Sequence, residues 1–257
     1  MLGMMSALLA AQAGTSALPP AGKWVVDFAD THCTLSRSFG AEASGVMLGL
    51  RPLPGNMGGD VILLSPRKVQ GSSAGAGHVL VRPSGERFPL RWVSGPSSGG
   101  PGRATQMFIE GRFWNAVSAA ESLEFDTAGR PVALSTGVMA RALATLKTCQ
   151  DDLLRRWGAD PSVPLVEAPD EVVHWFTPDD YPPVSFKKRE EGRVVILASL
   201  DRAGEPTACR TVRSSGFERL DAATCALLMR RGRFDPAVED GPATRWSVMA
   251  IRWDRPG

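Results

Sequence analysis

The chain has 257 residues, of which 43% are hydrophobic and 22% are charged, and its formal net charge is +2. This hydrophobic content can fill one large or two ordinary domain cores, which excludes a wholly disordered chain. The small net charge and the scattered basic residues exclude a continuous basic surface, so we expect no nucleic-acid partner.

Residues 1–17 form a run rich in Met, Leu and Ala that ends in small residues, with Ala11-Gln12-Ala13 as a cleavage site of the signal-peptidase type. We expect an export signal here, atypical because no Lys or Arg precedes Lys23, and a frayed N-terminus is the alternative. A membrane-spanning helix needs about 20 apolar residues, and neither this run nor any later segment supplies them. The sequence therefore predicts a soluble, exported protein with no membrane span of its own.

Residues 18–158 are predicted to form an antiparallel β-rich domain, whose function the sequence does not indicate. Short alternating runs between turns rich in Gly, Pro and Ser predict strands over residues 23–28, 45–50, 60–64, 78–81, 87–92 and 106–110. The segment GSSAGAG, residues 71–77, is expected to be a hairpin tip. It lacks the Gly-Lys-Ser/Thr of a phosphate-binding loop, and we expect no cofactor.

A helix within residues 135–158 is predicted to close this domain. Ser135 or Thr136 can cap its first turn, and apolar side chains recur after them at helical spacing. These apolar side chains are Val138, Ala142, Leu146, Cys149 and Leu153.

Four cysteines occur in the chain, and none of them forms a C-x-x-C pair: Cys33, Cys149, Cys209 and Cys225. With only three scattered histidines to help, they do not make a zinc site, and we expect no metal. An even number of cysteines in an exported protein favours two disulfides. Of the three possible pairings, Cys33 with Cys149 and Cys209 with Cys225 keeps each bridge inside one domain, and four reduced thiols are the alternative.

Residues 159–180 are predicted to be a linker. Acidic residues alternate there with prolines at positions 161, 164, 169 and 178, a composition that opposes a continuous helix or a central strand.

Residues 181–257 are predicted to form a second domain of order β-β-α-β. Strands are expected over residues 192–200, 207–212 and 246–253, with a helix over residues 217–231 after the break Ser214-Ser215-Gly216. One helix then lies across a three-stranded antiparallel sheet, so the fold class of the whole chain is α+β.

This second part resembles the C-terminal domain of the TonB family over about residues 180–254. The resemblance lies in Tyr181-Pro182, residues 191–194, Asp201 to Gly204, Ser214-Ser215-Gly216, residues 220–223, Arg233-Phe234 and Pro236-Ala237. It implies a periplasmic module that binds an outer-membrane receptor's TonB-box peptide or another envelope protein, and a link to TonB-dependent transport. The membrane anchor and long spacer of a transducing TonB protein are not visible in the sequence. We therefore expect partner binding rather than energy transduction by this chain alone.

The last strand is the predicted binding site, because an unpaired strand at a sheet edge accepts an extended peptide through main-chain hydrogen bonds. The same edge would permit a homodimer by strand pairing. Residues 181–257 hold 14 Lys and Arg against 10 Asp and Glu, a net charge of +4, which favours an acidic partner or docking on residues 1–180, whose net charge is −2. The site residues are Trp246, Ser247, Val248, Met249, Ala250, Ile251, Arg252 and Trp253.

The sequence supports a catalytic function less well than partner binding. Ser214 and Ser215 lack the G-x-S-x-G elbow of a nucleophilic serine, so no catalytic residue is predicted in the second domain. One alternative function is a periplasmic hydrolase with a site in the first domain around His32, His78 and Asp126. Another is a structural envelope component.

Overall fold

The computed structural model describes residues 16–41, 43–67, 70–98, 102–127 and 129–255. All but the last two residues of the predicted export signal lie outside them. The strands are β1 Val25–Phe28, β2 Cys33–Phe39, β3 Val46–Pro52, β4 Gly59–Ser65, β5 Ser73–Arg82, β6 Arg87–Pro96, β7 Arg103–Ile109, β8 Ser122–Thr127, β9 Arg130–Ser135, β10 Gly192–Leu200, β11 Pro206–Arg213 and β12 Arg245–Trp253. The α-helices are α1 Gly111–Val117, α2 Ala140–Trp157, α3 Pro183–Lys188 and α4 Glu218–Arg231, and the 3-10 helices are η1 Pro54–Asn56, η2 Asp170–His174 and η3 Pro178–Asp180.

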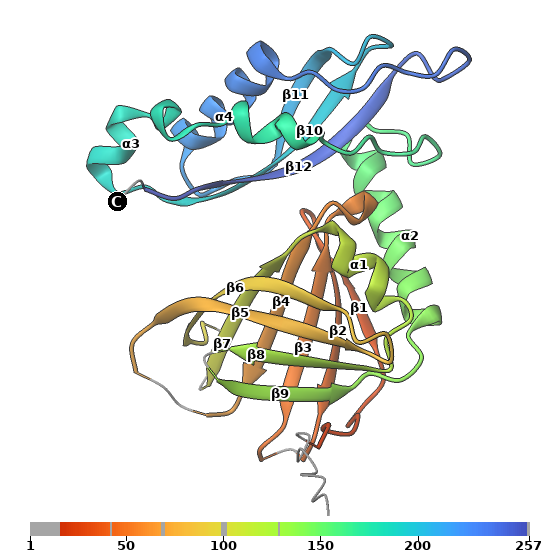
Figure 1. The fold of residues 1–257 in the computed structure, drawn as a ribbon, viewed down its shortest axis with the longest axis vertical. Coiled ribbons are helices and arrows are strands. Elements are labelled where there is room, and N and C mark those ends of the chain that lie inside the picture. The colour runs from red at the N-terminus through yellow and green to blue at the C-terminus, as the bar shows by residue number, and fades with distance from the viewer. Residues whose placement is uncertain (1–15, 42, 68–69, 99–101, 128, 256–257) are drawn as a thin grey trace, which may run out of the picture.

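The first nine strands form one antiparallel sheet in the order β1-β2-β3-β4-β7-β6-β5-β8-β9. Figure 1 shows this sheet rolled on itself. The segment before β1 closes the roll, because Leu18 N donates to Ala133 O at 2.8 Å on one side and Gly40 N donates to Pro19 O at 2.8 Å on the other. The roll therefore joins β9 to the end of β2 through residues 18–21.

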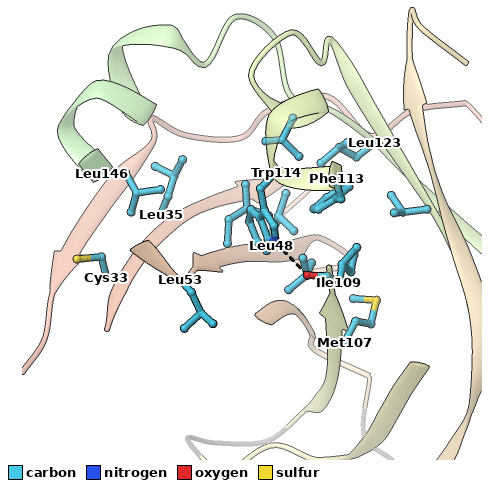
Figure 2. Close-up of a cluster of buried hydrophobic side chains, with 14 of the residues drawn as sticks. Cys33, Leu35, Leu48, Leu53, Met107, Ile109, Phe113, Trp114, Leu123 and Leu146 are labelled. Carbon is cyan, nitrogen blue, oxygen red and sulfur yellow. Dashed lines mark hydrogen bonds between the residues drawn. The ribbon is translucent and has the colours of Figure 1, made fainter. Parts of the chain in front are cut away.

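Large apolar side chains fill the interior of the roll, as the alternation of the strands predicts. Leu35, Leu48 and Met107 have no exposed surface. Helix α1 packs Phe113 and Trp114 into the same cluster (Figure 2), and the Trp114 indole donates to Ile109 O at 3.0 Å. The interior of the roll is thus filled by packed side chains, which form its hydrophobic core.

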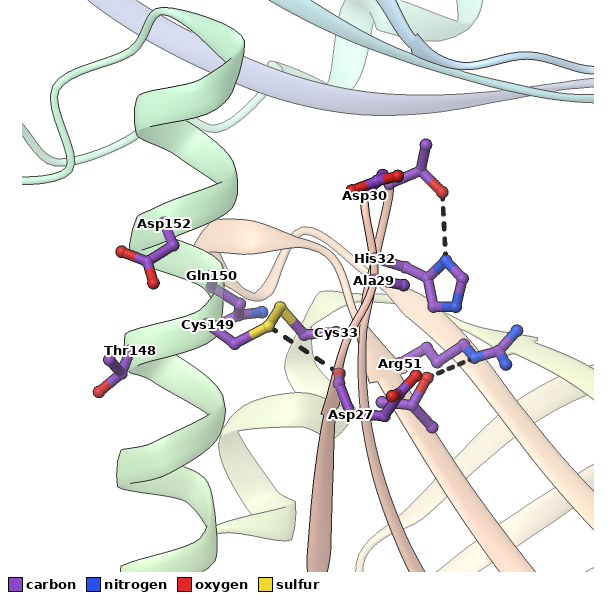
Figure 3. The surroundings of a disulfide bond; sticks show 12 residues. Asp27, Ala29, Asp30, His32, Cys33, Arg51, Thr148, Cys149, Gln150 and Asp152 are labelled. Carbon is purple, nitrogen blue, oxygen red and sulfur yellow. Dashed lines mark hydrogen bonds between the residues drawn. A yellow bond between two sulfur atoms is a disulfide. The ribbon is translucent and has the colours of Figure 1, made fainter.

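Helix α2 packs along β1 and β2 and is fastened there by the disulfide Cys33–Cys149 (Figure 3). The helix begins later than predicted. Val138 is 90% exposed, so it does not belong to the apolar stripe, and Ser135 is the last residue of β9. The Thr136 hydroxyl donates to Ala120 O at 3.2 Å, and it therefore does not cap the helix.

The last three strands form an antiparallel sheet in the order β11-β10-β12, and the predicted α+β class is confirmed. One face carries Val194, Ile196 and Ala198 and packs on α4, while Val195 and Leu197 point from the other face into the core that contains the roll. Figure 1 shows this sheet across one end of the roll, with α4 on its far side. Both faces of the small sheet are therefore covered.

The predicted hairpin tip at residues 71–77 is wrong, because Ser73 to Gly77 begin β5. The glycines fit a close approach. A Cβ on Gly77 would lie 2.0 Å from Asp126 O, and one on Gly75 would lie 2.8 Å from the Trp92 ring. Glycine lets the strands pack this closely because it has no side chain. A glycine-rich segment is also typical of loops, which is why the sequence favoured a hairpin tip here.

No α-helix of the described residues is both long and apolar enough to span a membrane.

Candidate functional site

Strand β12 is an edge strand of the three-stranded sheet, paired with β10 along its whole length. Its side chains alternate between the two cores: Met249, Ile251 and Trp253 lie in the cluster with α4, and Val248 lies in the cluster with the roll. Arg252 is the exposed residue of the strand, whereas Ser247 and Val248 have no exposed surface.

The outward side of β12 is identified by one hydrogen bond. Val166 N donates to Trp246 O at 2.8 Å, so the backbone of Trp246 points away from β10. Because N–H and C=O groups alternate along an antiparallel strand, the backbone groups of Val248, Ala250 and Arg252 point the same way. Val248 is fully buried, and the accessible part of this edge is therefore Ala250 to Arg252.

On the α4 side, the C-terminal end of β12 is flanked by Tyr181, the residue that follows the predicted linker. Tyr181 packs edge-on against Trp253, with ring centroids 5.5 Å apart, and its hydroxyl donates to Glu190 O. Burial raises the pKa of Tyr181, with a smaller contribution from the Glu191 charge. The Trp253 indole donates to Thr224 Oγ1 at 2.9 Å, which fixes the end of the strand against α4.

An ion pair holds the C-terminal end of the predicted linker on α4. Arg231 of α4 donates to both carboxylate oxygens of Asp180 at 2.5 and 2.8 Å, and Thr177 N donates to the same carboxylate at 2.9 Å. The Arg231 hydrogen bond, more than any other contact, holds the pKa of Asp180 far below its usual range. The segment therefore packs on α4 and does not hang free as a tether.

The roll and the three-stranded sheet meet through Asp60, whose side chain is only 4% exposed. It accepts from Arg193 at 2.6 Å and lies 3.2 Å from the guanidinium of Arg213, and Gln106 also donates to it at 3.3 Å. Arg193 in turn lies 4.0 Å above the Phe108 ring. The basic sheet is thus docked on a carboxylate of the acidic part of the chain, one of the two outcomes that the charge distribution favours.

The break Ser214-Ser215-Gly216 serves the start of α4. The Asp221 carboxylate accepts from both serine hydroxyls, at 2.5 Å from Ser214 and 2.7 Å from Ser215. Phe217, not a serine, is the N-cap residue, and Phe217 N donates to Ser215 Oγ at 3.2 Å. The serine hydroxyls are therefore engaged in local structure.

Both predicted disulfide pairings are present, Cys33–Cys149 and Cys209–Cys225. The second joins β11 to α4 at the rim of the small core. A register shift between Val195 and Ile196 in the β10–β11 pairing adjusts the strand near this bridge.

The three residues of the hydrolase alternative do not form one site. His78 and Asp126 are cross-strand partners on β5 and β8, but the His78 ring lies 3.3 Å from Arg87 Nη1, and buried Asp126 Oδ1 has no hydrogen-bond partner among the described residues. His32 lies in the turn between β1 and β2 (Figure 3). Burial, then the charges of Arg51 and Arg213, lower the pKa of His32, and its Nδ1 lies 3.2 Å from Thr31 Oγ1.

These features define a class of module, a β-β-α-β sheet with one covering helix and a partly open edge. Residues 177–254 match the family model described as Gram-negative bacterial TonB protein C-terminal, which confirms the resemblance seen in the sequence. The match covers less than a third of the chain. No curated protein and no solved structure matched the chain.

Proposed function

We propose that this chain is a periplasmic protein of the bacterial envelope that binds a protein or peptide partner through its TonB-like module. In this proposal residues 18–158 form one domain, residues 159–180 connect it, and residues 181–257 form the module. The match to the TonB C-terminal family supports an envelope role. The two disulfides support export, because such bonds persist in oxidising compartments.

The partner's strand adds to β12 at Ala250 to Arg252. The observation that carries this step is the outward direction of the backbone at Ala250 and Arg252, given by the Val166 to Trp246 hydrogen bond. An extended segment placed there gains main-chain hydrogen bonds that the edge otherwise offers to water. A TonB-box peptide has the extended form that this edge requires, and participation in TonB-dependent transport follows if the partner is a receptor.

Site-specific photo-crosslinking tests the proposal. The variant Arg252→p-benzoylphenylalanine of the full chain, irradiated in Gram-negative cells, should give a covalent adduct with an envelope protein. The control is the same replacement at Thr145, an exposed residue on α2. Adding Ala250→Pro, which removes one outward N–H without breaking the β10 ladder, should abolish the Arg252 adduct.

Identical adducts from the two positions, or an Arg252 adduct that survives Ala250→Pro, would contradict the proposal. An adduct of twice the chain's mass would instead show pairing of two copies at this edge, the alternative occupant.

A further inference from the structure

The second edge of the three-stranded sheet, β11, is more open than β12. Ala208 and Arg210 are exposed, and Cys209 and Thr211 are half-buried. On β12, by contrast, Val248 is fully buried at the corresponding middle of the strand. An added strand therefore finds more room along β11.

The backbone of β11 presents free hydrogen-bonding groups at this edge. In β10, residues that bond to β12 alternate with residues that bond to β11. Because β12 turns its odd-numbered residues inward, Leu197 and Ser199 of β10 face β11, where they pair with Arg210 and Ala208. Cys209 and Thr211 consequently point their N–H and C=O groups outward. No backbone hydrogen bond joins those groups to any other described residue.

The strand is held rigid for such a contact. The Cys209–Cys225 disulfide fixes it to α4, so little conformational entropy is lost when another strand adds. Threonine at position 211 also favours extended backbone.

Arg210 provides a charge that can select among the strands that add to β11. Its side chain is exposed, its guanidinium donates to Trp157 O at 3.3 Å, and no carboxylate of the described residues pairs with it. It lies between the two outward residues, so it faces the position directly opposite on an added strand. A carboxylate at that position would form a cross-strand ion pair, whereas a lysine would be repelled.

We propose that the β11 edge is a second strand-addition site, which takes an extended segment of another protein that carries a carboxylate opposite Arg210. This site is separate from the proposed β12 site, and the two can be tested independently.

A second copy of this chain is a poor occupant of the edge. If two β11 strands pair antiparallel through both outward residues, Cys209 of each faces Thr211 of the other, and Arg210 then faces Arg210. Like charges directly opposite destabilise such a pair, so the site favours a different, acidic strand.

The test uses the full chain and two fluorescein-labelled nine-residue peptides, one alternating Thr with Glu and one alternating Thr with Lys. Fluorescence anisotropy should show saturable binding of the Glu peptide, about tenfold tighter than that of the Lys peptide, because one ion pair is exchanged for a repulsion. Arg210→Glu should invert this preference.

Two matched proline variants assign the edge. Thr211→Pro removes an outward N–H of β11 and should weaken Glu-peptide binding about tenfold, the loss of one hydrogen bond plus the bulk of the ring. Ala250→Pro makes the same change on β12 and should leave this affinity within about twofold. Thermal unfolding and a non-reduced mass map check that each variant is folded with both disulfides intact. If Thr211→Pro does not fold, the charge inversion by Arg210→Glu decides the matter.

Three results would overturn the proposal: no saturable binding of the Glu peptide, loss of binding in Ala250→Pro but not in Thr211→Pro, or a concentration-dependent dimer that Thr211→Pro removes.

Discussion

Asp60 is the single carboxylate on which the docking of the small sheet most depends. It is buried between Arg193 and Arg213, and Arg193 stacks on Phe108. The three charged groups are therefore largely shielded from solvent. In the sequence, Asp60 is the first residue of a predicted strand. Its role could not be predicted, because the two arginines lie more than 130 residues further along the chain and meet it only after both sheets have formed.

Replacing this carboxylate should cost much more than replacing an exposed one. Asp60→Ala leaves two arginines without their shared partner, and we expect a loss of about 3 kcal/mol in the free energy of unfolding. Urea denaturation measures this loss. Asp30→Ala is the control, because the Asp30 side chain is fully exposed beside Arg156, and it should change stability by less than about 0.5 kcal/mol. Equal losses in the two variants would show that Asp60 does not hold the sheets together.

Asp180 makes the stability of the fold depend on pH in the acid range. Since its pKa in the folded state lies below that of an unfolded aspartate, near 3.9, its contribution is complete above about pH 5 and is lost as the pH falls further. Asp180→Asn should therefore be less stable than the wild type at neutral pH, and the gap should narrow below about pH 4. Asp179→Asn, at an exposed neighbouring position, is the control. A gap that stays constant from pH 7 to pH 3 would contradict this assignment.

At the scale of elements, sequence periodicity predicted the strongly alternating strands and both long helices. The two disulfide pairings followed from keeping each bridge inside one predicted domain. It missed β2, β8, β9 and α1, and it treated residues 71–77 as a hairpin tip. Gly75 and Gly77 show why: a glycine in a loop and a glycine beneath a crossing backbone look the same in one sequence. The start of α2 was misplaced because Thr136 finds its partner in Ala120, a tertiary contact.

The two disulfides should differ in their effect on stability. Cys33–Cys149 closes a loop with a sequence separation of 116 residues, and Cys209–Cys225 closes one of 16 residues. Loop-closure entropy predicts a loss of about 5 kcal/mol for the first and about 3 kcal/mol for the second when both cysteines of a pair become alanine. Denaturant titration of the two double variants measures this. A larger loss from Cys209→Ala/Cys225→Ala would mean that native packing, not loop length, dominates.

At the scale of the whole molecule, the small sheet lies between α4 and the roll, and the intervening residues 159–180 pack on both (Figure 1). Val166 closes one end of the β12 edge, so the roll and the connecting segment restrict where a partner can bind. The sequence predicted the edge strand as a site of eight residues. In the structure the outward-facing residues Ala250 and Arg252 remain accessible. The sequence could not show this restriction, because burial by the roll is not encoded in the strand itself.

Amide hydrogen exchange on the full chain, with and without a saturating TonB-box peptide, tests the central proposal most directly. Strand addition at β12 gives the outward N–H groups of Ala250 and Arg252 new acceptors, so their exchange should slow markedly, while exchange on α2 should not change. Unchanged exchange at Ala250 and Arg252 in the presence of bound peptide would contradict binding at this edge.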